Sequence, residues 1–333
     1  MKKAFTMAEI LISLTIIGII AAITLPSLRA NINEKAWATQ RKALYSRLSQ
    51  AIAMMPSLNG YGEYEGSWDN DIVTVTKDTA AAKFVTDGLA KILNINNICT
   101  IPFNMSSENA RKELKKCGIP EKITNMANSK LDFPTKLSEL NPMFTSTYNN
   151  SANPQKHINT NAAAFETKNG ESVAVFYNPY CQSDMGETAS HYTQPKMCAN
   201  FIYDLNGKKG PNKIGKDIGF ITVLYSTDSE IVMPLPLGSD AKAKISSALP
   251  QNAMQYCRKQ DKNSRMPNKE ELSAMYYNQL LLNINPPDND KSFCYWSSSV
   301  YQDGEMAWII NFRKGNIFLY NRIDKNYVRC IKK

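Results

Sequence analysis

The sequence predicts an α+β protein, and two stretches of the chain indicate this class. Residues 5–55 carry apolar side chains at helical spacing, first in an almost uncharged run and then in an amphipathic pattern. Residues 163–177 and 199–225 alternate between apolar and polar side chains, as antiparallel strands do. Because the helical stretch precedes the strands, we expect a long N-terminal helix packed on an antiparallel β-sheet head.

The length and composition of the chain favour two folded domains beyond this helix. The chain has 333 residues and, outside its first segment, the composition of a globular protein. Prolines and small residues between Pro234 and Pro250 indicate a boundary. We therefore expect a globular head over 56–235 and a small α+β domain over 250–333.

The chain is basic, with a net charge of +9. Such a charge permits acidic partners such as nucleic acid, teichoic-type polymers or anionic lipid. The basic residues are scattered, however, and no run of five or more occurs. We interpret the charge as a solvated surface.

The first 28 residues have the composition of a membrane anchor. Two lysines precede a single carboxylate, Glu9, and no further charge occurs before Arg29. The segment 5–28 matches the ~20 apolar residues that a helix needs to cross a bilayer. Because lysines favour the cytoplasmic side, we expect the rest of the chain to lie outside the cytoplasm. The helical pattern continues to about Met55 and ends at Pro56.

The carboxylate inside this segment is costly and needs a purpose. A secretory signal peptide has a basic start and an apolar core, but it has no use for an acid there. The segment from Met1 to Glu9 resembles the N-terminal signal of type IV pilins and type II secretion pseudopilins. Pro26 lies where that family often has a helix-kinking proline, whereas Ala4 replaces the glycine that the family usually has.

This resemblance implies a processing step and an assembly role. A prepilin peptidase would remove the leader 1–4 by cleaving between Ala4 and Phe5, and the new amino group of Phe5 would be methylated. Glu9 would pair with the N-terminal amine of a neighbouring pilin or pseudopilin subunit. The protein would lie in the cytoplasmic membrane as a single-pass protein before assembly, and in a cell-surface or periplasmic filament afterwards. An ordinary signal peptide cut after Ala22 and an uncleaved anchor are the alternatives.

The loop that joins residues 199–203 to 219–225 contains hard oxygen ligands. Asp204, Asn206 and Asp217 offer such oxygens, and the glycines between them let backbone carbonyls turn inward, which suits calcium. The loop also resembles the one near the end of pseudopilin heads, which binds calcium in some members. The alternative is a tight turn that needs Gly and Asn for its backbone alone.

The chain has seven cysteines and only two histidines, without a CxxC motif, so a zinc site is poorly supported. Outside the cytoplasm, disulfides are expected. The spacing suggests the pairs Cys99–Cys117, Cys181–Cys198 and Cys257–Cys330 and leaves Cys294 over, although spacing alone does not fix the connectivity.

The C-terminal part carries a second set of motifs. They are Arg265 to Leu272, Tyr295-Trp296-Ser297-Ser298-Ser299, Ala307-Trp308 and Tyr327-Val328-Arg329-Cys330. Together they resemble a C-type-lectin-like module of bacterial surface proteins, covering about 250–333. This resemblance supports the pair Cys257–Cys330, because in this fold class a cysteine on the first helix commonly bridges one on the last strand. The lectin-type calcium motifs are absent. Trp296 and Trp308 are either core side chains or contacts for a glycan or protein ligand, and the ligand-binding residues are unknown.

The sequence contains no motif of a known catalytic site, so we expect no enzyme and no catalytic residue. No cofactor is required, apart from the calcium considered above. The first hypothesis is a minor, tip or accessory subunit of a type IV filament or type II secretion apparatus. The alternative is a membrane-anchored surface adhesin whose C-terminal module binds glycan or protein.

Overall fold

The structure of the chain is a computed structural model. It describes residues 7–59, 80–102, 105–141, 161–178, 196–225, 231–232, 246–248, 250–284, 293–301, 304–313, 315–323 and 326–332. The predicted leader 1–4 and Phe5 lie outside the described residues, as does Cys181.

The N-terminal helix α1 covers Met7–Asn59 and divides between two compact units, residues 1–43 and 44–333. In the first unit, the large apolar side chains between residues 11 and 20 are exposed, with exposed fractions of 51–63%. In the second unit, Leu44, Leu48 and Ile52 are buried. The helix therefore contributes to the core of the second unit only from residue 44 onward.

The predicted membrane anchor does not stand. Among the residues that the structure describes, no helix offers a stretch that is both long and apolar enough to cross a membrane. This finding overturns the predicted single-pass anchor over 5–28, and with it the predicted localisation in the cytoplasmic membrane.

The second unit contains a six-stranded antiparallel sheet in the order β1-β4-β5-β6-β7-β8. The predicted hairpin over 163–177 forms its β4–β5 pair, and the turn contains Gly170 at a φ of 84°, a conformation that favours glycine. The strands are β1 (Ile95–Thr100), β4 (Ala163–Thr167), β5 (Ser172–Tyr177), β6 (Lys196–Asp204), β7 (Ile218–Tyr225) and β8 (Ile231–Val232).

Shorter helices and strands lie between α1 and β4 in the sequence, apart from β1. The helix α3 begins at the N-cap Ser106, whose side chain accepts a hydrogen bond from the Asn109 N–H at 3.4 Å. The elements are the π-helix Phe84–Gly88, the 3-10 helix Leu89–Lys91, α3 (Ser107–Lys116), the strand pair β2 (Lys122–Thr124) and β3 (Lys130–Asp132), and α4 (Leu137–Leu140).

The C-terminal part forms a five-stranded sheet in the order β13-β12-β11-β14-β9, three short helices and a two-stranded sheet. A capping box between Asn268 and Glu271 starts the second of these helices. The elements are β9 (Ser246–Ala248), α5 (Pro250–Gln260), β10 (Ser264–Arg265), α6 (Lys269–Tyr277), α7 (Gln279–Leu282), β11 (Cys294–Val300), β12 (Met306–Asn311), β13 (Ile317–Asn321), β14 (Asn326–Val328) and β15 (Ile331–Lys332).

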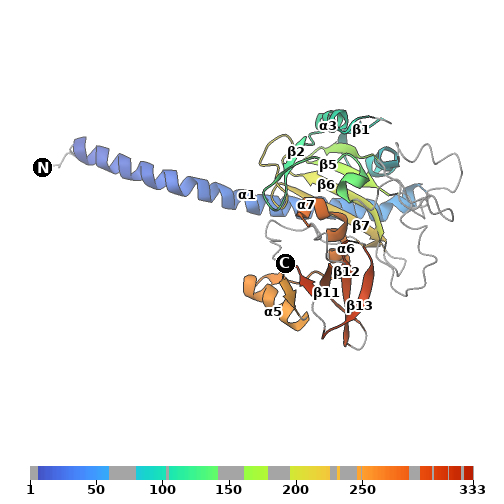
Figure 1. The fold of residues 1–333 in the computed structure, drawn as a ribbon. Helices are drawn as coiled ribbons and strands as arrows, with labels where there is room; N and C mark the ends of the chain where they lie inside the picture. Colours follow the sequence, from blue (N-terminus) through green and yellow to red (C-terminus); the bar gives the residue numbers. More distant parts are fainter. Residues whose placement is uncertain are drawn as a thin grey trace. The chain divides into compact units, whose positions relative to one another are not determined.

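The predicted fold class is wrong in its architecture. Strands dominate the described structure after α1, and the helices there contain at most 11 residues. One buried apolar cluster contains side chains from Cys99 to Ile331, on both sides of the predicted boundary between Pro234 and Pro250. Helix α6 lies between the two large sheets, against β7 on one side and β11 and β12 on the other (Figure 1). The two expected globular parts thus share a core.

A candidate ligand site beside the 204–218 loop

The loop between β6 and β7 is organised by two buried aspartates. The Asp217 carboxylate accepts hydrogen bonds from the backbone N–H groups of Asn212, at 2.7 Å, and Lys213, at 2.9 Å. The Asp204 carboxylate accepts one from the Asn206 N–H at 3.0 Å. The Leu205 N–H in turn donates to the Asp217 carbonyl at 2.9 Å. Both carboxylates therefore hold the loop backbone in place, as expected of aspartates in tight turns.

The two carboxylates form an electrostatically unfavourable pair. Asp204 is 1% exposed and Asp217 is fully buried. Burial, together with the negative charge of Asp217, raises the pKa of Asp204 to about 8, and hydrogen bonds from the Asn206 and Gly207 backbone oppose the rise. A bound cation would relieve this repulsion, because it favours the charged form of both groups.

Two further observations decide whether the loop fits a calcium ion. Buried oxygens of Asp204 (Oδ2), Asn206 (Oδ1) and Asn212 (Oδ1) have no hydrogen-bond partner in the structure. Oxygen atoms of this kind are the ligands that calcium prefers. Among the described residues, on the other hand, no group of three or more His, Cys, Asp or Glu side chains gathers around one point. The loop thus fits a calcium ion only if amide and backbone oxygens, together with the two carboxylates, complete its coordination shell.

A cavity of about 700 Å³ lies next to this loop. Its walls come from two segments that are far apart in the sequence, the turn after α3 and the start of the 204–218 loop. The lining residues are Lys115, Gly118, Ile119, Pro120, Glu121, Lys122, Gly207, Lys208 and Asn212.

Two glycines let these walls approach each other. Gly118 has a φ of 80° and Gly207 a φ of 60°, both in the left-handed region that glycine tolerates. A Cβ atom at Gly118 would lie 2.2 Å from the Ser172 Oγ and 4.0 Å from the Gly207 Cα. The wall of the cavity is therefore backbone at this point, and a larger residue at position 118 has no room.

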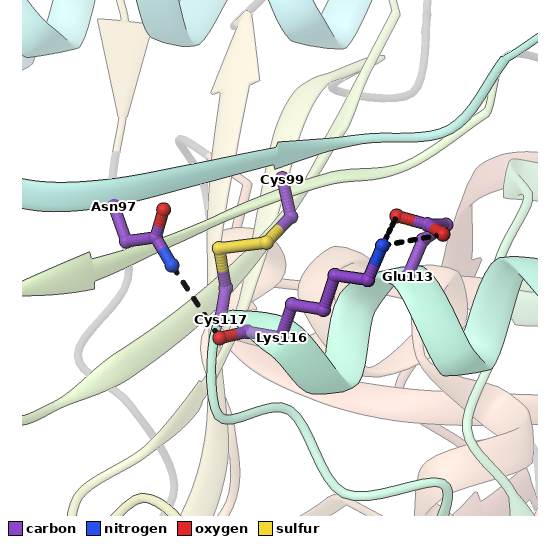
Figure 2. Close-up of a disulfide and its surroundings, with 5 residues drawn as sticks. All are labelled: Asn97, Cys99, Glu113, Lys116 and Cys117. Atoms are coloured by element: carbon purple, nitrogen blue, oxygen red, sulfur yellow. Dashed lines mark hydrogen bonds and ion pairs between the residues drawn. A yellow bond between two sulfur atoms is a disulfide. The ribbon is translucent and has the colours of Figure 1, made fainter.

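A disulfide fixes the first wall to the sheet. Cys117, the C-cap of α3, bonds to Cys99 in β1. Figure 2 shows this bond and the Asn97 side chain, which donates to the Lys116 carbonyl at 3.4 Å. Because Cys117 directly precedes Gly118, the disulfide sets the position at which the turn enters the cavity.

The other predicted residues lie apart from this cavity. Cys257 in α5 bonds to Cys330 near the end of the chain, while Cys294 forms no disulfide and is buried in the same apolar cluster. Cys198 is disulfide-bonded, and its expected partner Cys181 lies outside the described residues. Ala4 and Phe5 also lie outside them, and Glu9 lies in α1 without a described side chain.

Sequence reasoning missed the lysines of the cavity. Lys115 lies in α3 and Lys122 begins β2, whereas Lys208 lies in the loop after β6. Their separation in the sequence hides the cluster, and only the fold brings them to one cavity.

In comparisons with known proteins, no protein family matches the chain, and no curated protein matches it either.

Proposed function

We propose that the protein is a minor subunit of a type IV filament or type II secretion apparatus, matured by a prepilin peptidase. The observation that carries this proposal is the apolar surface of α1. Seven large side chains, namely Leu11, Ile12, Leu14, Ile16, Ile17, Ile19 and Ile20, are more than half exposed. A helix that is apolar around its circumference is normally buried.

Equivalent helices of neighbouring subunits would cover this surface. The N-terminal sequence supports such an assembly, because Ala4, Phe5 and Glu9 fall where prepilin processing and subunit pairing require them. A carboxylate that is buried among packed apolar helices needs a cationic partner. The N-terminal amine of a neighbouring subunit supplies that charge once the leader is removed. Prepilin peptidase and other pilin or pseudopilin subunits are the partners that follow.

The N-terminal mass of the protein from its native cells tests the processing step. A mature chain that begins with N-methylated Phe5 is the expected result. A chain that begins near Ile23, or one that keeps Met1, would contradict the proposal.

A pair of variants tests the assembly step. Glu9→Leu should be processed normally but enter sheared filaments poorly, because the amine of the neighbouring subunit loses its partner. Glu34→Leu changes an exposed carboxylate of the same helix and should assemble like the wild type. Equal incorporation of the two variants would remove the assembly role of Glu9.

A structural calcium ion in the 204–218 loop is part of the proposal. The unpartnered oxygens of Asp204, Asn206 and Asn212 support it, as does the raised pKa of Asp204. Asp204, Asn206 and Asp217 would hold the ion, and the ion would neutralise the repulsion between the two buried carboxylates. No step of filament assembly depends on it in this proposal.

A second function, ligand binding through the C-terminal sheet, is favoured by one observation. The edge strand β13 and the turns beside it expose large apolar side chains, including Phe318, Tyr320 and Ile323, the last at 77%. Exposed aromatic side chains of this kind bind glycans or proteins. The double variant Phe318→Ala/Tyr320→Ala should abolish binding to envelope glycans without changing incorporation into filaments. Unchanged glycan binding by this variant would exclude the strand as the binding surface.

A further inference from the structure

We propose that the cavity beside the 204–218 loop binds a small multivalent anion that carries phosphate groups. This inference is independent of the filament function and of calcium. It rests on the charge of the cavity walls, on the way that each charge is partnered, and on the rigidity of the backbone around them.

The walls carry an excess of positive charge. Three lysines, Lys115, Lys122 and Lys208, line the cavity together with one carboxylate, Glu121. The net charge of the lining is therefore +2, from three cations and one anion. Charges of one sign in a hollow focus the electrostatic potential and raise the local concentration of ions of the opposite sign.

The partners of the three lysines leave this excess in place. Lys115 pairs with Glu121 at 2.6 Å, so these two charges compensate each other. Lys122 has only a long contact of 3.9 Å to Asp132, a carboxylate that is 55% exposed. Within the described part of the chain, Lys208 has no carboxylate partner. Lys122 and Lys208 are thus the two cations that an anion would engage, and solvent-exposed contacts of the Lys122 type compete weakly.

The types of side chain fit a phosphate group. The charged groups among the described lining residues are three lysines and one glutamate, and this excess of cations favours an anion with more than one negative charge. Among the same residues there is no aromatic side chain, so a neutral sugar finds no ring to stack on. Lysine ammonium groups act as point charges that tolerate many orientations, and they bind the several oxygens of a phosphate group well.

The geometry around the lysines is held rigid before any ligand binds. The Cys99–Cys117 disulfide anchors one wall, and the Asp217 carboxylate holds the Asn212 backbone of the other. The backbone that carries the lysines therefore needs little ordering on binding, which favours affinity.

Isothermal titration of the full chain with inorganic tripolyphosphate in calcium-free buffer tests the proposal. We expect wild-type binding that weakens with added salt, as charge-dominated binding does. The double variant Lys122→Glu/Lys208→Glu should bind at least about tenfold more weakly, because it reverses the two unengaged cations of the cavity. The absence of wild-type binding at millimolar tripolyphosphate would overturn the proposal.

A charge-matched control separates the cavity from the general positive charge of the protein. The double variant Lys259→Glu/Lys262→Glu changes the net charge by the same amount at exposed lysines in α5 and in the turn after it, which do not line the cavity. It should weaken binding by no more than about twofold, because neither lysine lines the cavity and salt screens exposed charges. Equal weakening by both double variants would show attraction to the surface as a whole and would refute the site. Thermal unfolding of the wild type, of the two double variants and of Lys208→Ala, the mildest change, verifies that each of these four proteins is folded.

The source of the phosphate is distinguished by a second titrant, a short glycerol-phosphate polymer. Tighter binding of tripolyphosphate assigns the cavity to a free oligophosphate, and tighter binding of the polymer assigns it to a phosphate-bearing chain. Both results support recognition of phosphate, provided that Lys122→Glu/Lys208→Glu weakens the binding.

Discussion

Asn200 in β6 and Asn278 at the end of α6 share buried hydrogen bonds across 78 residues of sequence. The Asn200 Nδ2 donates to the Asn278 Oδ1 at 2.8 Å, and the Asn278 Nδ2 donates to the Asn200 Oδ1 at 3.2 Å and to the Thr222 Oγ1 at 3.0 Å. All three side chains are at most 1% exposed. Since an unsatisfied buried polar group is costly, this network fixes the C-terminal helix on the first sheet.

Substitution of Asn278 should therefore destabilise the whole second unit. Asn278→Ala leaves the buried Asn200 Nδ2 without its acceptor, although the Thr222 Oγ1 still donates to the Asn200 Oδ1 at 2.7 Å. We expect a loss of about 2–4 kcal/mol in the free energy of unfolding. Urea unfolding followed by circular dichroism measures the loss. Asn109→Ala, at an exposed position of α3, should change the stability by less than about 0.5 kcal/mol. A loss confined to the C-terminal part, with the first sheet still intact, would contradict the shared core.

The same shared core predicts that residues 250–333 do not fold when expressed alone. Buried side chains of α6 and α7, among them Tyr276 and Leu281, belong to the cluster that continues into the first sheet. The Asn141 side chain also donates to the Tyr276 carbonyl at 2.9 Å from outside this segment. The isolated segment should show no cooperative thermal transition and poor dispersion of its amide signals in NMR. A sharp transition would mean that the contacts across the core are dispensable.

These contacts explain how far the sequence predicts the fold. The hairpin over 163–177 follows from local alternation and an Asn-Gly turn, and the start of α6 follows from the capping box at Asn268. Both signals are short in range. The polar network that joins Asn200 to Asn278 leaves no local signal, because an asparagine in a strand and one at a helix end are each ordinary. For this reason the composition change near Pro250 gives no sign that buried side chains on its two sides belong to one cluster.

The candidate site likewise contains residues that the sequence predicts and residues that it does not. Asp204 and Asp217 could be chosen from the sequence because they lie in one loop, and the structure brings their charges close enough to interact. The cavity lysines could not be chosen from the sequence. Lys122 and Lys208 line the same cavity only because β2 and its neighbours pack against the 204–218 loop. The prediction of an N-terminal membrane anchor was wrong for a different reason. Apolar composition over 5–28 does not by itself establish a membrane span, and the described helices contain none.

The pH dependence of stability tests the buried carboxylates. The pKa of Asp204 is raised from 3.8 to about 8 in the folded protein, so the folded state keeps a proton that the unfolded state loses. Between these two values the unfolded state binds fewer protons, and the stability that Asp204 contributes is therefore lost as the pH rises toward about 8. Asp204→Asn, which does not titrate, should flatten the decline between pH 5 and pH 8 in calcium-free buffer, as measured by urea unfolding.

Calcium should act on the same residue in the opposite sense. A bound calcium ion favours the charged carboxylate, so added calcium should raise the melting temperature of the wild type at pH 8 more than at pH 5. Asp204→Asn should lose most of this increase, whereas Asp87→Asn, at an exposed site, should keep it. Equal melting temperatures of the wild type with calcium and with a chelator would leave the loop as a turn that needs no ion.

The close approach of Gly118 to Ser172 predicts a difference between two glycines of similar conformation. Gly118 and Gly170 have φ values of 80° and 84°, so alanine pays the same backbone cost at either position, about 1 kcal/mol. At Gly170 the new Cβ meets nothing within 4 Å, but at Gly118 it meets the Ser172 Oγ at 2.2 Å. Gly118→Ala should therefore cost about 1–3 kcal/mol more than Gly170→Ala in urea unfolding, since a clash in a packed interior forces neighbours to shift. Adding Ser172→Gly to Gly118→Ala should recover part of that difference, because it removes the atoms that the new Cβ meets. Equal stability of the two single variants would mean that the wall of the cavity yields without cost, and the rigidity assigned to the site would be lost with it.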